Sequence, residues 1–139
     1  MQIAAQVAIT MGSIMLLASA ALADSRSDLG NAAERLAKET RIAAAHGDTV
    51  SQSYATDAQA LARSAERFRS DVETQTVSDA KVSDQFQRVA GFYKRFKDQV
   101  KLANTQQAFA DLKAVNAPYR EVERQLGVQP EDDGANDGE

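Results

Sequence analysis

Three segments of the chain repeat apolar residues in alternating steps of four and three positions, and this repeat limits the possible folds more than any other feature. Residues on one side of an α-helix recur every three or four positions, so each segment is predicted to form an amphipathic helix. The average step of about 3.5 residues is typical of the apolar seam in a left-handed helical bundle. The repeated residues are Tyr54, Ala58, Leu61, Ala65, Phe68 and Val72; Val82, Phe86, Val89, Tyr93, Phe96 and Val100; and Ala108, Leu112, Val115, Tyr119, Val122 and Leu126.

A weaker stripe of the same kind precedes these three segments and predicts a first helix over roughly residues 28–46. Its apolar residues are Leu29, Ala33, Leu36 and Ala43. Because alanine buries little apolar area, this helix is expected to be held less firmly than the others. Gly47 follows directly, and we predict that it caps the C-terminus of the helix.

Capping and helix-breaking residues indicate where the other helices begin and end. The second helix is expected to end near Gln75 and the third near Ala103. Pro118 lies inside the fourth helix, and it is expected to bend this helix near Ala114 or to break it, because proline lacks a backbone N–H. The candidate caps and stops are Ser78 or Asp79 before the third helix, Asn104 or Thr105 before the fourth, and Gly127 and Pro130 after it.

Four helices joined by short connections favour an all-α fold, an up-down-up-down antiparallel four-helix bundle with left-handed, heptad-like packing. This bundle is predicted to occupy residues 24–130. An alternative with the same repeats is a long helical hairpin that completes its apolar core by dimerising. The protein is therefore expected to be a monomer or a homodimer.

The N-terminal segment, residues 1–23, contains no charged side chain and ends in Ala21-Leu22-Ala23. An apolar run that ends in small residues at the first and third positions before the cleavage site is typical of a secretory signal peptide. Cleavage is expected after Ala23, which predicts a periplasmic or secreted protein without stable membrane insertion. The alternative is an uncleaved membrane anchor, since the run from Ile3 to Ala23 is long enough to span a bilayer.

Charge is distributed unevenly along the chain. Residues 131–139 contain five acidic residues and no basic one, so a disordered acidic tail is expected. Without them the chain has 16 basic and 15 acidic residues, a net charge near +1. A possible contact face for a protein partner or an acidic surface is formed by Arg88, Lys94, Arg95, Lys97 and Lys101 of the third helix. The tail can compete for this face by folding back, whereas interleaved acidic residues and expected export argue against nucleic acid as a partner.

Most residues that metal, haem or covalent chemistry requires are missing. The chain has no cysteine and its three methionines lie in residues 1–23, so the single histidine, His46, has no partner for axial haem ligation. A di-iron site needs inward-pointing Glu-x-x-His pairs, and no acidic residue occupies a stripe position in the second to fourth helices. The chain also lacks a serine, histidine and aspartate at a spacing typical of a catalytic triad, and it lacks a glycine-rich phosphate loop. We therefore expect no catalytic residue, metal site or cofactor, and we expect His46 to be an exposed helix-end residue.

These observations predict a small exported, non-enzymatic helical-bundle protein that acts through protein or surface interaction, as an adaptor or in a chaperone-like role. The alternative is a carrier of a small apolar or aromatic ligand in the bundle core. Its expected ligand-lining residues are the aromatic residues of the third and fourth helices: Phe86, Tyr93, Phe96 and Tyr119.

Overall fold

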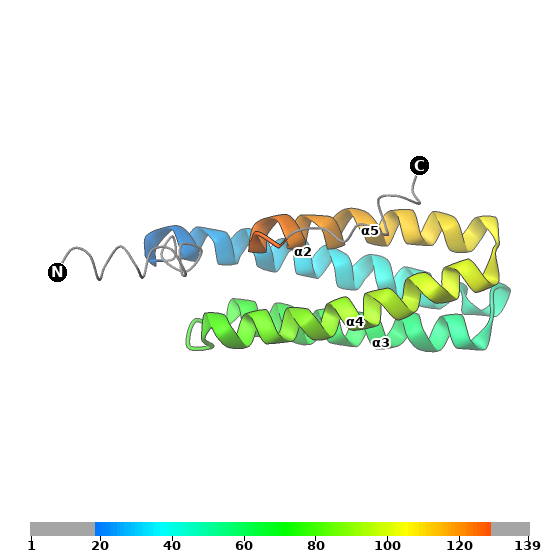
Figure 1. The fold of residues 1–139 in the computed structure, drawn as a ribbon, viewed down its shortest axis with the longest axis horizontal. Coiled ribbons are helices and arrows are strands. Elements are labelled where there is room, and N and C mark those ends of the chain that lie inside the picture. The colour runs from blue at the N-terminus through cyan, green and yellow to red at the C-terminus, as the bar shows by residue number, and fades with distance from the viewer. Residues whose placement is uncertain (1–18, 129–139) are drawn as a thin grey trace.

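A computed structural model describes residues 19–128, with side chains from Arg26 onwards, and this part of the chain is helical without any β-strand. Consecutive long helices run in opposite directions, side by side (Figure 1). Helix α2 packs closely against α3 and α5, and α3 against α4, whereas α4 and α5 approach each other closely over a much shorter length. The elements are α2 (Ser19–Ala45), the 3₁₀ turn η1 (His46–Thr49), α3 (Gln52–Glu73), α4 (Asp79–Ala103) and α5 (Gln106–Leu126). Most of the predicted signal segment (residues 1–18), Pro130 and the predicted acidic tail lie outside the described residues.

Three predicted caps, Ser78, Thr105 and Gly127, are confirmed, whereas Asn104, a candidate start of the fourth helix, ends α4 instead. Ser78 and Thr105 accept hydrogen bonds at the N-termini of α4 and α5, from the backbone N–H groups of the residues three positions on. Ser51 caps α3 in the same way. At the C-termini, Asn104 and Gly127 adopt left-handed backbone conformations with φ of 52° and 74°.

Helix α2 differs from the prediction at both ends. It is already helical at Ser19, the first described residue, and not only from near residue 28, because residues 19–27 contain alanines that favour helix and no glycine or proline that would stop it. Gly47 does not have a positive φ, so it is not the predicted left-handed cap. It lies buried in η1, where an added Cβ would stand 2.3 Å from the Cβ of Ala55 in α3. The close approach of two backbones therefore requires glycine at this position.

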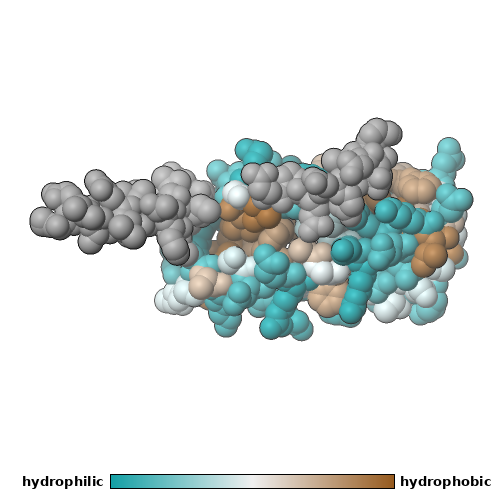
Figure 2. Space-filling model, in the orientation of Figure 1, coloured by the Kyte–Doolittle hydropathy of each residue, from teal (hydrophilic) through white to brown (hydrophobic). Residues whose placement is uncertain are grey.

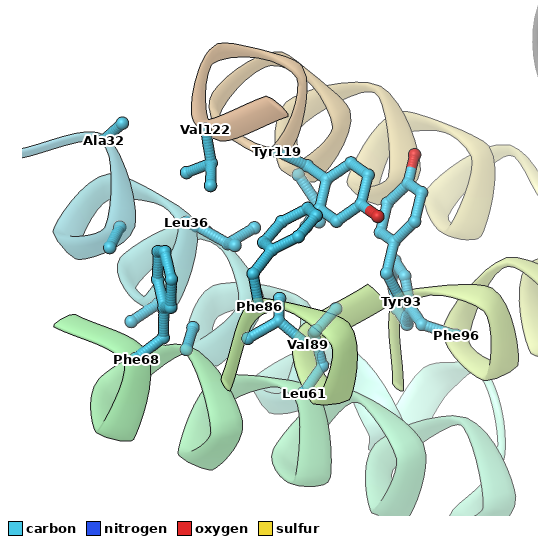
Figure 3. Packing of buried hydrophobic residues seen from close by; sticks show 14 of the residues in the cluster. Ala32, Leu36, Leu61, Phe68, Phe86, Val89, Tyr93, Phe96, Tyr119 and Val122 are labelled. Carbon is cyan, nitrogen blue, oxygen red and sulfur yellow. The ribbon is translucent and has the colours of Figure 1, made fainter. Parts of the chain in front are cut away.

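The apolar core consists of the predicted stripes. Every stripe residue of α3 and α4 is buried, as are Leu29, Ala33, Leu36 and Ala43 of α2. In α5, Leu112 and Leu126 are only half-buried at the edge of the core. Helix α5 continues through Pro118, which is itself buried, so the proline does not break it. The small residues of α2 face the large rings and branched side chains of the other helices (Figure 3).

Arg26 joins the first part of α2 to the connection between α3 and α4. Its side chain is buried, and its guanidinium donates hydrogen bonds to the backbone carbonyls of Val72 at 3.3 Å, Thr74 at 3.1 Å and Val77 at 2.8 Å. It also pairs with the Asp79 carboxylate at 2.7 Å. A cation at these carbonyls complements the C-terminal dipole of α3 and satisfies acceptors that the helix itself leaves unpaired. One side chain of α2 thus holds the connection between α3 and α4.

Candidate functional site

Four of the five basic residues predicted to form one contact face of α4 lie on two separate strips, and the fifth, Lys101, is exposed in the last turn of the helix. Arg88 and Arg95 line a shallow groove together with Gly91 and Phe92. Lys94 and Lys97 lie on the side of α4 that faces α5, where they line a recess with residues of that helix. Seven residues separate Arg88 from Arg95, two helical turns along one face, whereas Lys94 and Lys97 are rotated away from them by the helical repeat. We call the first group, Arg88, Gly91, Phe92 and Arg95, the outer strip of α4.

The outer strip combines an aromatic ring with positive charge. Phe92 is half-buried, and the guanidinium carbon of Arg95 lies 5.4 Å from the centre of its ring. Gly91 is exposed, and a Cβ built on it would meet no atom within 4 Å. The groove has a volume of about 330 Å³. Such a surface offers a partner an apolar contact, two cations and a place where its backbone can approach closely.

Three of the four predicted ligand-lining residues lie in one aromatic column (Figure 3). The rings of Phe86 and Tyr119 stack with centres 5.6 Å apart, and those of Tyr119 and Tyr93 with centres 3.7 Å apart. The ring of Phe96, the fourth predicted residue, packs on Tyr54 of α3 with ring centres 5.4 Å apart. All four predicted residues are buried and fill core volume in this structure. Ligand binding by them stays a prediction.

The side chains between α4 and α5 form a small recess beside this column, which we call the α4–α5 seam. It has a volume of about 40 Å³, roughly the space of one water molecule. Tyr93 Oη donates a hydrogen bond of 2.5 Å to Asn116 Oδ1 across the seam, and Lys97 Nζ lies 5.4 Å from the centre of the Tyr93 ring. The recess is lined by Ala90, Tyr93, Lys94, Lys97, Tyr119, Arg120 and Glu123.

A buried polar cluster at the opposite end of the bundle from Arg26 was not predicted from the sequence. The Asp111 carboxylate accepts hydrogen bonds from Tyr54 Oη at 2.5 Å and Gln107 Nε2 at 3.0 Å, and His46 Nδ1 lies 2.9 Å from it. His46 lies directly after the end of α2, as predicted, but the prediction that it is exposed is wrong, because its side chain is 36% exposed and paired with a carboxylate that is 6% exposed. The cluster joins η1, α3 and α5, and burial, together with the bond to Asp111, holds the pKa of Tyr54 well above its ordinary value.

The sequence did contain one signal for this cluster. Asp111 follows Ala108 by three positions and precedes Val115 by four, so it shares the buried face of α5. Glu123 is buried in the same helix beside Val122, and Arg120 Nη1 pairs with its carboxylate at 3.1 Å. Acidic residues thus do enter the buried side of the last helix. Among residues 19–128, however, no three histidine, cysteine or acidic side chains are arranged so that they could hold a metal ion.

A wider groove of about 410 Å³ runs between α2 and α3. Arg41 bridges it by pairing with Glu66, which also accepts a bond from Arg69 at 3.3 Å. Burial is the largest single influence on the pKa of the Glu66 carboxyl and raises it, but the hydrogen bonds and charges of Arg41 and Arg69 together outweigh burial and hold the pKa below its ordinary value. The lining also contains Arg63, so the basic side chains of the groove outnumber its one carboxylate.

Comparison of the chain with protein-family models, with curated proteins and with solved structures finds no match. Within residues 19–128, none of the helices combines the length and the apolar character needed to cross a membrane.

Proposed function

We propose that this protein is a small exported helical-bundle protein without enzymatic activity, which acts by binding a protein partner through the outer strip of α4 in an adaptor or chaperone-like role. The observation that carries this proposal is the combination of a half-buried aromatic ring, two arginines and an exposed glycine on one face of one helix. Aromatic and arginine side chains contribute most of the binding energy in many protein interfaces. Two exposed guanidinium groups favour an acidic segment on the partner.

Export belongs to the same proposal. The uncharged, apolar residues 1–23 and the motif Ala21-Leu22-Ala23 support a signal peptide that is cleaved after Ala23, and hence a periplasmic or secreted protein. Cleavage there leaves Arg26 as the third residue of the mature chain, so the bonds that Arg26 makes to the α3–α4 connection are retained. We also infer that the four helices pack with the left-handed geometry expected from their heptad-like stripes.

Site-specific photo-crosslinking tests the binding surface. A photoreactive amino acid replaces Gly91, because the space beside this residue is open, and adducts formed in living cells are identified by mass spectrometry. We expect one partner to dominate, and we expect Arg88→Glu with Arg95→Glu to abolish its adduct. The matched control is Arg67→Glu, which reverses an exposed charge on α3 outside the outer strip. If the adducts are diffuse, or if both variants behave alike, the outer strip is not a specific binding surface.

A second candidate function, a carrier of a small apolar or aromatic ligand, is favoured by the α4–α5 seam. Of the neighbouring helix pairs, α4 and α5 are in close contact over the shortest length. The recess between them lies beside two tyrosine rings. Phe96→Ala is a poor test of this function, because Phe96 is fully buried against Tyr54 and its loss should destabilise the whole fold by about 3–5 kcal/mol. Variants confined to the seam test it directly.

A further inference from the structure

The groove between α2 and α3 belongs to neither of the two candidate functions. Figure 2 shows the face of the bundle that α4 and α5 form, where apolar patches are separated by hydrophilic surface. In Figure 1, α2 and α3 lie behind α5 and α4, so the α2–α3 groove is on a different side of the bundle. Its volume of about 410 Å³ is within the range of small-molecule sites in proteins. The groove therefore offers a separate place for a ligand.

Three alanines give the groove an apolar floor. Ala44 and Ala45 are at the end of α2, and Ala62 lies on α3. Because each of these side chains is a single methyl group, the two helices leave open a space that larger side chains would fill. Ala45 is exposed and Ala44 is half-buried, so their methyl groups remain in contact with water. A flat apolar group that covers this floor would remove apolar surface from water.

An ion-pair network holds one guanidinium group beside the alanine floor. Arg41 of α2 pairs with Glu66 of α3, and Arg69 donates a second bond to the same carboxylate at 3.3 Å. Two cations thus offset the charge of Glu66, and the pairing fixes the position of Arg41 at the edge of the groove. A planar guanidinium stacks well on aromatic rings. The groove therefore suits an aromatic ring better than a flexible alkyl chain.

Arg63 brings a positive charge that this network does not use. It lines the groove, is exposed, and forms no ion pair with another residue of the described part of the chain. Gln59 also lines the groove and precedes Arg63 by four positions, so the two side chains are neighbours on the surface of α3. A guanidinium and a side-chain amide both donate hydrogen bonds, and a carboxylate has two oxygens that accept them. The charge of the groove therefore favours an anion.

We propose that the α2–α3 groove binds a small aromatic carboxylate as a free molecule. The ring covers the methyl groups of the alanine floor and stacks on the guanidinium of Arg41. The carboxylate accepts hydrogen bonds from Arg63 and Gln59. Burial of the ring supplies most of the affinity, and Arg63 selects for the anion. This inference goes beyond the proposed function and does not rest on it, because no residue of α4 lines the groove.

Titration with β-naphthoate, followed by heteronuclear NMR on the protein purified after expression from its full gene, tests the location of the site. We expect saturable shifts concentrated in residues 41–45 and 59–66, with a dissociation constant of about 1 mM. Ala45→Leu should weaken binding by at least about fivefold, because the larger side chain covers the floor. The matched control is Ala110→Leu, at an exposed position of α5 outside the groove, which should leave the affinity unchanged. Circular dichroism verifies that both variants fold.

The role of the carboxylate is tested with β-naphthamide, which has the same rings without the charge. It should bind to the wild type about two- to fivefold more weakly than β-naphthoate, the size expected for one solvent-exposed ion pair. Arg63→Gln should weaken β-naphthoate binding by a similar factor and leave β-naphthamide binding unchanged. The matched control is Arg67→Gln, an exposed arginine of α3 outside the groove, which should affect neither molecule.

The outcomes that would overturn the inference are distinct. If the shifts do not saturate about tenfold above the expected dissociation constant, or if Ala45→Leu and Ala110→Leu bind β-naphthoate equally well, the groove is not the site. If β-naphthamide binds as tightly as β-naphthoate, or if Arg63→Gln and Arg67→Gln behave alike, the carboxylate is not recognised. None of these results bears on the outer strip of α4, whose partner is detected separately by crosslinking from Gly91.

Discussion

The absence of a side chain at Gly47 is required by the packing of η1 against α3. A Cβ at this position would lie 2.3 Å from the Cβ of Ala55, which is much closer than two carbon atoms can approach. Gly47→Ala should therefore lower the free energy of unfolding by about 2–3 kcal/mol, because η1 or α3 must shift to accept the methyl group. Urea denaturation followed by circular dichroism measures this loss.

Gly91 provides the matched comparison at the residue scale. It lies in the middle of α4, and an added Cβ would meet no atom within 4 Å. Gly91→Ala should raise the free energy of unfolding by about 0.5–1 kcal/mol, because alanine loses less conformational freedom in a helix than glycine. If Gly47→Ala raised stability as Gly91→Ala is expected to, steric crowding would not be the reason for glycine at position 47.

Tyr54 makes the stability of the fold sensitive to alkaline pH. Burial, followed by the hydrogen bond to Asp111 and the charge of that residue, raises its pKa above the ordinary value of 10.0. The phenol stays protonated in the folded state but ionises in the unfolded state, so its contribution is complete below pH 10 and is lost as the pH rises further. The free energy of unfolding should fall by up to about 1.4 kcal/mol per pH unit from this group alone.

Urea denaturation of the wild type and Tyr54→Phe at about pH 9 and about pH 11 isolates this contribution. The variant should be less stable at the lower pH, because Asp111 loses a hydrogen-bond donor. Its stability should then decrease less between the two pH values than that of the wild type. Equal decreases would mean that Tyr54 ionises without opening the fold.

At the scale of elements, α2 is joined to the α3–α4 connection by Arg26. Removing its side chain leaves the carbonyls of Thr74 and Val77 and the Asp79 carboxylate without this donor. Arg26→Ala should lower the free energy of unfolding by about 2–4 kcal/mol. Hydrogen exchange should be fastest in residues 74–78, and Arg67→Ala, which removes an exposed arginine of α3, should change stability by less than about 0.5 kcal/mol. A similar small loss for both variants would show that the Arg26 bonds are not maintained in solution.

The positions of the helices could be predicted because they depend on local signals. Apolar spacing located the stripes of α3 and α4, and Ser78 and Thr105 marked helix starts. The Asp111 cluster could not be predicted in this way, since His46 and Asp111 are 65 positions apart and meet only when η1 and α5 pack together. The sequence pattern also placed all the basic residues of α4 on one face. In the structure, Lys94 and Lys97 line the recess beside α5, whereas Arg88 and Arg95 lie on the outer strip.

At the scale of the whole molecule, α4 carries the surfaces on which both candidate functions depend. Its buried stripe packs against α3 and contributes Phe86 and Tyr93 to the aromatic column. Its outer strip carries Phe92 and two arginines, and its remaining side borders the α4–α5 seam. A partner on the outer strip and a ligand in the seam would therefore contact the same helix on different sides. Occupation of one surface can influence the other only if α4 moves as a unit.

One chain contains enough apolar surface to complete its own core, which bears on the alternative of a dimerising hairpin. The stripes of α2, α3, α4 and α5 bury one another within a single chain. The large apolar side chains that remain exposed in the described part are Ile42, Leu102 and Phe109, and they come from three different helices. They do not repeat along any one helix as a second seam would, so little apolar area is available for a stable dimer.

We therefore expect the chain to be a monomer when it is cleaved after Ala23 as proposed. Size-exclusion chromatography with light scattering at two protein concentrations about tenfold apart should give the same monomer mass, since a weak dimer would dissociate on dilution. Leu102→Ser, which removes the side chain that is 77% exposed, is the control for association through the end of α4 and should leave the mass unchanged. A dimer mass that Leu102→Ser reduces to the monomer mass would place an interface at the end of α4. A dimer that persists in the variant would instead support the hairpin arrangement, in which two chains share one core.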